Sequence, residues 1–284
     1  MKAREALKAA AGRLAAGSDT PRLDAELLMA HALGISREQF LLSHLDDDAP
    51  ASFEALVARR AAGEPVAYIV GRRAFWTIEL EVGPGVLVPR PDSETLIEAA
   101  VAYFGAAGPA AILDLGTGPG TLLLAALDQW PEARGLGIDA SVAALAYARR
   151  NAERLGLGGR AEFRLGDWAE GLDGRFDLIL CNPPYVADGE TLPRDVMEWE
   201  PREALFAGAD GLSDYHRLAA AAPPLLGAGG IACVEIGVGQ EEAVSSLFAS
   251  RGMKVSPRRD LAGRVRCLVL ERHGFAADPS RRRH

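Results

Sequence analysis

The first 64 residues carry a helical pattern. Apolar positions recur three and four residues apart, a spacing that places them on one face of an α-helix. Pro21 after Thr20 is typical of a helix start, and Gly34 and Gly63 are typical of helix ends. The pattern predicts a small bundle of four short helices, near residues 2–16, 21–33, 36–44 and 51–62.

The pattern changes at residue 65. Residues 65–91 contain β-branched and aromatic side chains, the alternating stretch "TIELEV" and frequent Gly and Pro, which together predict a β-hairpin or linker. Residues 92–104, "DSETLIEAAVAYF", are helical in pattern again, with Asp92 and Ser93 as candidate N-caps. We expect this helix to lead into a second domain.

Apolar runs alternate with helical stretches from residue 110 onward. The runs "AAILDLG", "RGLGID", "AEFRLGD", "FDLILCN" and "IACVEIG" are each separated by a helix-like or loop segment, which predicts a doubly wound, mostly parallel sheet of the α/β class. The last two runs, "MKVSPRRD" and "RVRCLVLER", are close enough to pair antiparallel. We expect this domain to cover residues 92–274 and to be followed by a flexible tail, residues 275–284.

Composition limits the classes of function. Of 284 residues, 49% are hydrophobic and 25% are charged, which is typical of a globular protein with a packed core. The formal net charge of −8 argues against broad, sequence-independent binding to nucleic acid, because such binding needs a basic face. A local basic patch stays possible.

Cysteines and the N-terminus predict the compartment. Cys181, Cys233 and Cys267 are odd in number and lie in apolar runs, so we expect buried free thiols in a reducing environment. The N-terminal stretch lacks the apolar core of a signal peptide, and no run reaches the roughly 20 apolar residues of a membrane span. We expect a cytoplasmic monomer with no membrane contact.

The first candidate for chemistry is a glycine turn at a strand end. In parallel sheets, ligands bind beyond the carboxyl ends of the strands. "DLGTGPG", from Asp114 to Gly120, lacks the Lys-Ser/Thr ending of a phosphate-binding loop, and its Gly-x-Gly-x-Gly spacing departs from that of dinucleotide enzymes. A carboxylate at Asp114 suits a cationic ligand better than a pyrophosphate. The alternative is a turn whose glycines serve packing alone.

The next two strand ends carry acidic residues. Asp139 lies about twenty residues beyond the glycine turn, where an acid commonly accepts hydrogen bonds from ribose hydroxyls. It could instead cap the helix that begins near Ser141. Asp167 and Trp168 end the following strand, where a carboxylate can accept from an exocyclic amine and the indole can cover an aromatic face. A purely structural Trp is the alternative.

The fourth strand ends in "LCNPPY". Asn182 offers a carbonyl acceptor and an amide donor, Pro183 and Pro184 fix the backbone and leave carbonyls available, and Tyr185 can cover a planar group. Acceptors that take both protons of a planar –NH2 group would turn its lone pair toward an electrophile. Asn-Pro-Pro could also serve only as turn punctuation.

These motifs, in this order, resemble class I S-adenosylmethionine-dependent methyltransferases that act on planar nitrogen. More narrowly, "GEPVAYIVGRRAFW", "VLVPRPDSE", "ILDLGTGPG", "FDLILCNPPYV" and "EPREALFAGADGL" resemble the HemK/PrmC family of release-factor glutamine methyltransferases, over nearly the whole chain. The resemblance implies a seven-stranded class I methyltransferase sheet preceded by a helical substrate-docking domain, residues 1–64. It implies methylation of the Gln side-chain amide in the Gly-Gly-Gln motif of class I peptide-chain release factors, without a metal.

The resemblance also implies roles for individual residues. Asn182 and the Pro183 carbonyl would take the two amide protons of the substrate, with Pro184 and Tyr185 shaping its slot. Arg90, Phe75 and Trp76 resemble family positions near the substrate or the domain junction. The implied S-adenosylmethionine-binding set is Asp114, Gly116, Thr117, Gly118, Pro119, Gly120, Asp139, Asp167, Trp168 and Asn182.

Two departures and three alternatives remain. Pro119 stands where the family usually has Ser or Thr, and it removes a backbone N–H, so a contact there must come from a neighbour. The family's "EFWGL" is "AFWTI" here. The main alternative function is a nucleic-acid adenine methyltransferase, since Asn-Pro-Pro-Tyr can hold any planar amine. A nicotinamide dehydrogenase would leave that motif unexplained, and an inactive release-factor-binding adaptor would not need it.

Overall fold

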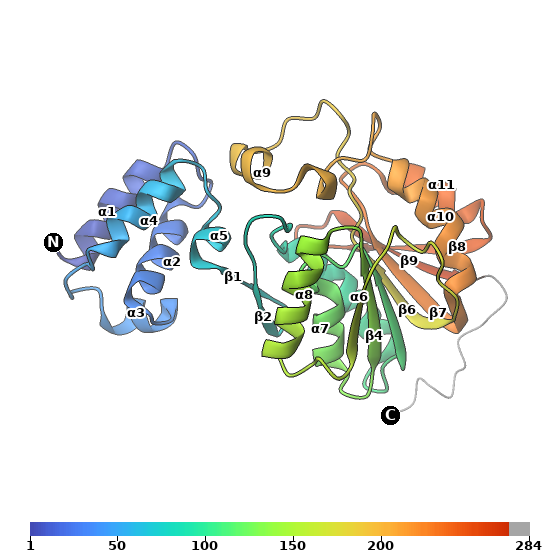
Figure 1. Ribbon diagram of the computed structural model, residues 1–284. Helices are drawn as coiled ribbons and strands as arrows, with labels where there is room; N and C mark the ends of the chain where they lie inside the picture. The colour runs from blue at the N-terminus through green and yellow to red at the C-terminus, as the bar shows by residue number, and fades with distance from the viewer. Residues whose placement is uncertain (273–284) are drawn as a thin grey trace. The chain divides into compact units, whose positions relative to one another are not determined.

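The computed structural model describes residues 1–272, and the predicted tail, residues 275–284, lies outside them (Figure 1). The chain divides into two compact units. The helical unit contains Met1–Arg72, Val82–Pro84 and Thr191–Glu200. The sheet unit contains Arg73–Glu81, Gly85–Glu190 and the chain from Pro201 onward. Neither unit is therefore one continuous stretch of sequence.

The helical unit contains the four predicted helices, whose ends lie within two residues of the predicted ones. Their apolar faces meet in a core in which Leu7, Leu28, Met29 and Phe40 are fully buried. The helices of this unit are α1 (Ala3–Leu14), α2 (Pro21–Leu33), α3 (Arg37–Ser43), α4 (Ser52–Ala61), α5 (Val66–Val70) and α9 (Arg194–Trp199).

The prediction of a β-hairpin or linker over residues 65–91 was right for the hairpin and wrong for its start. Strands β1 (Arg72–Phe75) and β2 (Ile78–Glu81) pair as a hairpin, but the residues before them form the short helix α5. That helix begins after Pro65 and ends at Gly71, which has a left-handed φ of 78°. Ile69 packs into the helical core, so burial overrides the β preference of the valines around it.

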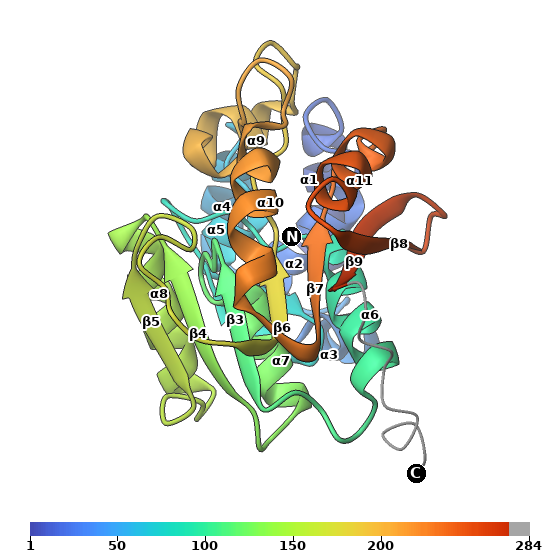
Figure 2. The same ribbon diagram turned by 90° about the vertical axis from the view of Figure 1, so that its right-hand side faces the viewer.

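The sheet unit is built on a seven-stranded sheet in the order β5-β4-β3-β6-β7-β9-β8 (Figure 2). The first five strands in this order pair in parallel, and β9 pairs antiparallel with both β7 and β8. This confirms the predicted mostly parallel sheet and the antiparallel final pair. The strands are β3 (Ala111–Leu115), β4 (Arg134–Asp139), β5 (Ala161–Leu165), β6 (Phe176–Cys181), β7 (Leu226–Glu235), β8 (Met253–Arg259) and β9 (Val265–Arg272).

Helices cover both faces of the sheet, as a doubly wound fold requires. Figures 1 and 2 show α6 (Glu94–Phe104), α7 (Thr121–Gln129) and α8 (Val142–Arg154) on one face, and α10 (Ser213–Leu225) and α11 (Glu241–Ala249) on the other. The three cysteines are buried free thiols, as predicted. Among residues 1–272, no helix combines the length and the apolar character needed to cross a bilayer.

The helix predicted over residues 92–104 begins differently from the prediction. Pro91–Ser93 form a short 3-10 helix, η1, and α6 begins only at Glu94. Neither predicted cap holds: the Ser93 side chain does not cap α6, and Asp92 forms an ion pair with Arg266 instead. Both side chains are drawn to β-strand residues far along the sequence, which local pattern cannot reveal.

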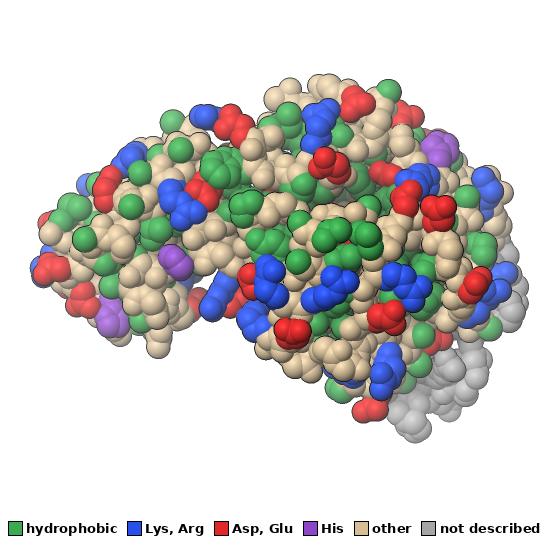
Figure 3. All heavy atoms as spheres, in the orientation of Figure 1, with side chains coloured by type: hydrophobic (Ala, Val, Ile, Leu, Met, Phe, Trp, Pro, Cys, Tyr) green, Lys and Arg blue, Asp and Glu red, His purple; other side chains and the backbone are tan. Residues whose placement is uncertain are grey.

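The surface carries charges of both signs. Figure 3 shows basic and acidic side chains interspersed on the face that carries α8. Two arginines of that helix, Arg150 and Arg154, form ion pairs with Glu81 and Glu79. This face is therefore unlike the uniformly basic surface that binds nucleic acid without sequence preference.

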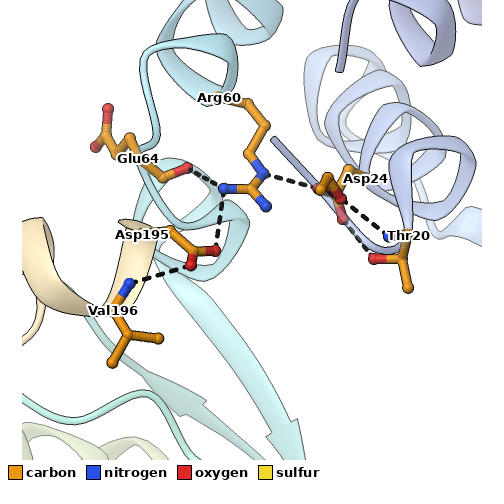
Figure 4. Close-up of polar contacts among 7 residues, drawn as sticks. Thr20, Asp24, Arg60, Glu64, Asp195 and Val196 are labelled. Carbon is orange, nitrogen blue, oxygen red and sulfur yellow. Dashed lines mark hydrogen bonds and ion pairs between the residues drawn. The ribbon is translucent and has the colours of Figure 1, made fainter. Parts of the chain in front are cut away.

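A buried arginine ties α9 to the other helices of the helical unit. Arg60, in α4, is only 8% exposed and lies between two carboxylates (Figure 4). Its Nε is 2.7 Å from Asp24 Oδ2, and its Nη1 is 3.2 Å from Asp195 Oδ2. The Thr20 hydroxyl donates to Asp24, and Arg60 also donates to the Glu64 carbonyl oxygen. The cluster is thus a paired, hydrogen-bonded set in which Arg60 and Asp24 are buried and Asp195 is partly exposed.

We predict that Arg60→Ala lowers the free energy of unfolding by about 3–5 kcal/mol, because it leaves two carboxylates without their counter-charge. Arg4→Ala is the matched control: Arg4 pairs with Asp46 at the surface, and losing such a pair costs about 0–1 kcal/mol. Urea denaturation of both variants measures the difference. Equal losses would show that the buried cluster contributes no more than a surface pair.

Candidate active site

A cavity of about 650 Å³ lies at the carboxyl ends of the parallel strands. Its walls come from the loops that follow β3, β4, β5 and β6, the four strand ends singled out in the sequence. β3 lies between β4 and β6, so the chain leaves β3 in the crevice where the strand order reverses. This is where open α/β sheets bind their ligands.

The backbone N–H groups of the glycine turn after β3 hold the turn against the end of β4. The Gly116 and Thr117 N–H groups both donate to the Ile138 carbonyl oxygen at 2.9 Å. The Gly118 N–H donates to Asp139 Oδ2 at 2.8 Å. Gly120, at the start of α7, has a φ of 88° that favours glycine. The turn is therefore fixed to the end of β4 before any ligand binds.

Asp114 lies beneath this turn and is 1% exposed. Its Oδ2 accepts from the Thr117 hydroxyl at 2.6 Å and from the Leu123 N–H at 3.2 Å. Its Oδ1 has no hydrogen-bond partner among residues 1–272. Burial raises the pKa of Asp114 to about 7, against the lowering effect of those two donors. A buried acceptor that lines the cavity and lacks a partner suits a cationic group of a ligand.

Asp139 lines the same cavity and does not cap α8. Its Oδ1 accepts from the Ser141 N–H at 2.8 Å, while the Ser141 hydroxyl is the helix cap and accepts from the Ala144 N–H. The alternative reading of Asp139 as the helix cap is therefore wrong. Burial raises its pKa, and the backbone donors lower it. Each carboxylate oxygen keeps acceptor capacity for a ligand hydroxyl.

Trp168 forms the opposite wall. A side chain at Gly116 would come within 3.6 Å of the indole, so the ring lies over the glycine turn. Burial raises the pKa of the Asp214 carboxyl and the nearby Trp168 side chain lowers it, and Asp167 forms an ion pair with Arg217. Asp214 and Arg217 belong to α10 and line the cavity, although no sequence pattern marks them as ligand contacts. Only the fold brings α10 to this edge.

Asn182 and Pro184 line the cavity at the end of β6. Asn182 Nδ2 donates one of its two N–H groups to the Ser93 hydroxyl oxygen at 3.0 Å, so the amide keeps its carbonyl Oδ1 as acceptor and one N–H as donor. Tyr185 is turned inward, with its hydroxyl 3.3 Å from Glu235 Oε1, and burial raises its pKa above the ordinary value.

Other predicted residues divide into two groups. Arg90 lines the cavity together with the glycine-turn residues. Gly120, Pro183 and Tyr185 lie outside the set of described residues that line it, and so do Phe75 and Trp76. Trp76 is held by Glu94 and Gln129, which explains its place beside α6 and α7.

A further segment also lines the cavity. In the sequence, this segment served only as a sign of family resemblance. Pro201, Glu203 and Ala204 lie in or next to the short 3-10 helix η2 (Arg202–Ala204). They belong to the quoted stretch "EPREALFAGADGL". That resemblance was the available signal, because no local pattern marks these residues as ligand contacts.

The structure also shows how Pro119 is accommodated. Its carbonyl oxygen accepts from the buried Asn151 side chain at 3.0 Å. Pro119 has no N–H to donate to Asp139, but Asp139 does not need one from it, because the Gly118 N–H already donates to Asp139 Oδ2. The departure from the family pattern therefore leaves the turn intact.

The strand order, the antiparallel β9 and a ligand cavity at the switch point define a class I methyltransferase fold. In agreement, residues 109–220 match the family model described as "Methyltransferase domain". The hMettl16 catalytic domain, solved in complex with the MAT2A 3'UTR hairpin 6, matches with a TM-score of 0.57 at 16% identity, over 78% of this chain and 84% of that one. At this identity the likeness shows the fold alone.

Sequence relatives narrow the class. Residues 5–71 match the model described as "PrmC N-terminal domain". The release factor glutamine methyltransferase of Rhodospirillum rubrum is 45% identical over 93% of this chain and 82% of its own length. The one from Cereibacter sphaeroides is 46% identical, over 94% of this chain and 98% of its own length. The chain belongs to the release factor glutamine methyltransferase family and is a methyltransferase.

We predict that Gly120→Ala destabilises the protein by about 2–4 kcal/mol, because an added Cβ combines a left-handed φ with a 2.7 Å approach to the buried Leu124. Gly118→Ala is the control. Its φ of 57° is also left-handed, but its Cβ would meet nothing within 4 Å, so we expect a loss of about 1 kcal/mol. Urea denaturation compares the two. Equal stability would contradict the close packing of the turn on α7.

Proposed function

We propose that this protein methylates the side-chain amide nitrogen of the Gln in the Gly-Gly-Gln motif of class I peptide-chain release factors, with S-adenosylmethionine as methyl donor. The names of its relatives support the substrate class. The observation that carries the chemistry is Asn182 at the end of β6. It lines the cavity, and its Nδ2 is already engaged by Ser93.

The residues around the cavity fit S-adenosylmethionine. The unpaired Asp114 Oδ1 would accept from the cationic amino group, Asp139 would hold the ribose hydroxyls, and Trp168 would cover the adenine. The glycine turn gives the backbone a close approach to the methionine portion. When bound, the cofactor would supply a methyl group on a positively charged sulfur, an electrophile that needs no metal. The new N–CH3 bond would form as the S–CH3 bond breaks, S-adenosylhomocysteine would leave, and the amide nitrogen would lose one proton.

The chain's own residues would prepare the nucleophile. Asn182 Oδ1 and the Pro183 carbonyl oxygen would accept the two protons of the substrate amide, which holds its plane and turns the nitrogen lone pair toward the methyl group. Fixed acceptors stabilise the positive charge that develops on nitrogen. Alignment of the reacting atoms supplies much of the rate enhancement. Tyr185 and Pro184 would set the width of the slot, and Arg90 would contact the bound factor.

We also propose that the helical unit docks the release factor and that the enzyme works as a cytoplasmic monomer. In support of docking, this unit contributes none of the described residues that line the cavity. A nucleic-acid adenine methyltransferase is less favoured, because the relatives are named for a protein substrate and α8 presents paired charges of both signs.

We predict that Asn182→Ala lowers methyl transfer to a purified release factor by about 10²-fold or more, because one of the two fixed acceptors is lost. Transfer of label from radiolabelled S-adenosylmethionine measures the rate. A release factor whose motif Gln is replaced by Ala is the control substrate and should take no label. Wild-type rates for Asn182→Ala, or label on an oligonucleotide but not on the factor, would contradict the proposal.

A second prediction concerns the pH dependence of cofactor affinity. Below about pH 7 the Asp114 carboxyl of the free protein becomes protonated and loses its attraction for a cationic amino group. The Kd for S-adenosylmethionine should therefore rise as the pH falls from 8 to 6, by up to about tenfold per unit below the pKa. Calorimetry measures this Kd at each pH for the wild type and for Asp114→Asn. Titration of the cofactor itself affects both proteins equally, so the difference between them reports on Asp114. The same slope in both proteins would exclude Asp114 as the titrating contact.

A further inference from the structure

Behind Asn182 lies a chain of hydrogen bonds that the methyl-transfer chemistry does not use directly. Ser93, at the end of η1, is 2% exposed and Glu235, at the end of β7, is 1% exposed. Asn182 Nδ2 donates to Ser93 Oγ at 3.0 Å. Burial raises the pKa of the neighbouring Glu235 carboxyl and the Ser93 side chain lowers it, and Glu235 Oε2 has no hydrogen-bond partner among residues 1–272. Tyr185 reaches the same carboxylate, with its hydroxyl 3.3 Å from Oε1.

Proton counting gives this chain a direction. A serine hydroxyl has one proton to donate, and an ionised carboxylate can only accept. The Ser93 proton is therefore directed to Glu235, and the Ser93 oxygen is left to accept from its other neighbour. Asn182 can meet that acceptor only with its NH2 group. An amide turned the other way would place two acceptors, Oδ1 and Oγ, against each other.

Arg266 and the neighbouring hydroxyls favour the ionised, accepting form of Glu235, which is the main form above about pH 7. Burial raises its pKa to about 7, whereas Ser93, Arg266 and Tyr185 lower it and Asp92 raises it. Arg266 is itself held by Asp92, with Nη2 2.9 Å from Oδ2. Two of the three residues of η1 thus face the β7 and β9 side of the sheet, Asp92 toward Arg266 and Ser93 toward Glu235.

The backbone at both ends of the chain of bonds is also fixed. The Tyr215 hydroxyl donates to the Glu235 carbonyl oxygen at 2.9 Å. Gln240 Nε2 donates to the Tyr185 carbonyl oxygen at 3.0 Å, and a Cβ on Gly237 would come within 3.0 Å of the Tyr185 ring. The backbone at Glu235 and at Tyr185 is therefore held by hydrogen bonds separate from those of their side chains.

We propose that Ser93 and Glu235 are positioning residues for methyl transfer: Glu235 takes the Ser93 proton, Ser93 takes the Asn182 NH2 group, and Asn182 Oδ1 is thereby turned to face the substrate. Glu235 orients Tyr185 through the second bond. The inference rests on the proposed function for its kinetic test, and the orientation of the Asn182 amide can be measured without any substrate.

Ser93→Ala tests the hydroxyl. We expect kcat for release-factor methylation to fall about tenfold, the usual worth of one orienting hydrogen bond, with KM for the factor and Kd for S-adenosylmethionine changed less than about twofold. Ser93→Thr keeps the hydroxyl and should restore kcat to within about threefold of the wild type. Ser250→Ala, at an exposed serine, is the control. Unchanged kcat in Ser93→Ala, or no rescue by threonine, overturns the role of Ser93.

Glu235→Gln tests the direction of the chain of bonds. Its amide can donate to Ser93, which frees the Ser93 proton to point at Asn182, so we expect the same loss of kcat, about tenfold. Because both substitutions break one chain, the double variant should be no slower than either single variant. Losses that multiply to about a hundredfold would show two independent effects and would overturn the inference.

The side-chain amide of Asn182 supplies a readout that does not depend on the substrate. In 15N-labelled protein, its NH2 signals, assigned by their loss in Asn182→Ala, should exchange slowly with solvent. In Ser93→Ala and Glu235→Gln they should exchange about tenfold faster or more. Failure of wild-type methyl transfer with this NMR result intact would refute the proposed function alone. Exchange that is equally fast in all three proteins would refute the positioning chain.

Discussion

Parallel pairing of β3 with both β4 and β6 is the constraint on which the site depends. It brings the ends of three strands to one edge, so the glycine turn, Asp139 and Asn182 lie around one cavity although they are far apart in the sequence. The helices on both faces then have little freedom, since each must return the chain to the start of the next parallel strand. The packed core fixes the geometry of this edge, and the loops that follow the strands supply the side chains for chemistry.

Two buried carboxylates show what the site costs. Asp114 and Glu235 are each about 1% exposed, and burial raises the pKa of both to about 7. A carboxylate with a raised pKa opposes folding at neutral pH, because its charged form is better solvated in the unfolded chain. The large apolar core around β3, β6 and β7 offsets this cost. The protein thus loses some folding stability at Asp114 and Glu235, the positions where acceptors are fixed before a ligand binds.

Sequence predicted most of the architecture because periodicity and punctuation are local properties. Helices α1 to α4, the strands and the antiparallel β9 all followed from such patterns, and Asn182 and Asp139 could be placed by their position at the end of a strand. The predictions that failed were overridden by tertiary contacts. Helix α5 forms because Ile69 packs into the helical core, and Ser93 lies beside Glu235 instead of capping α6. Asp214 and Arg217 were missed for the same reason, since only the packing of α10 brings them to the cavity.

The discontinuous helical unit limits how segments of this protein can be exchanged with other proteins by recombination. Thr191–Glu200 pack with the N-terminal helices, while the residues on either side of this segment belong to the sheet unit. Arg60 draws one of its two carboxylate partners, Asp195, from this insertion. Recombination that moved only the first 72 residues to another protein would therefore carry a buried arginine and leave one of its counter-charges behind. The two segments of the helical unit must therefore change together, so substitutions in α4 and in α9 are expected to constrain one another.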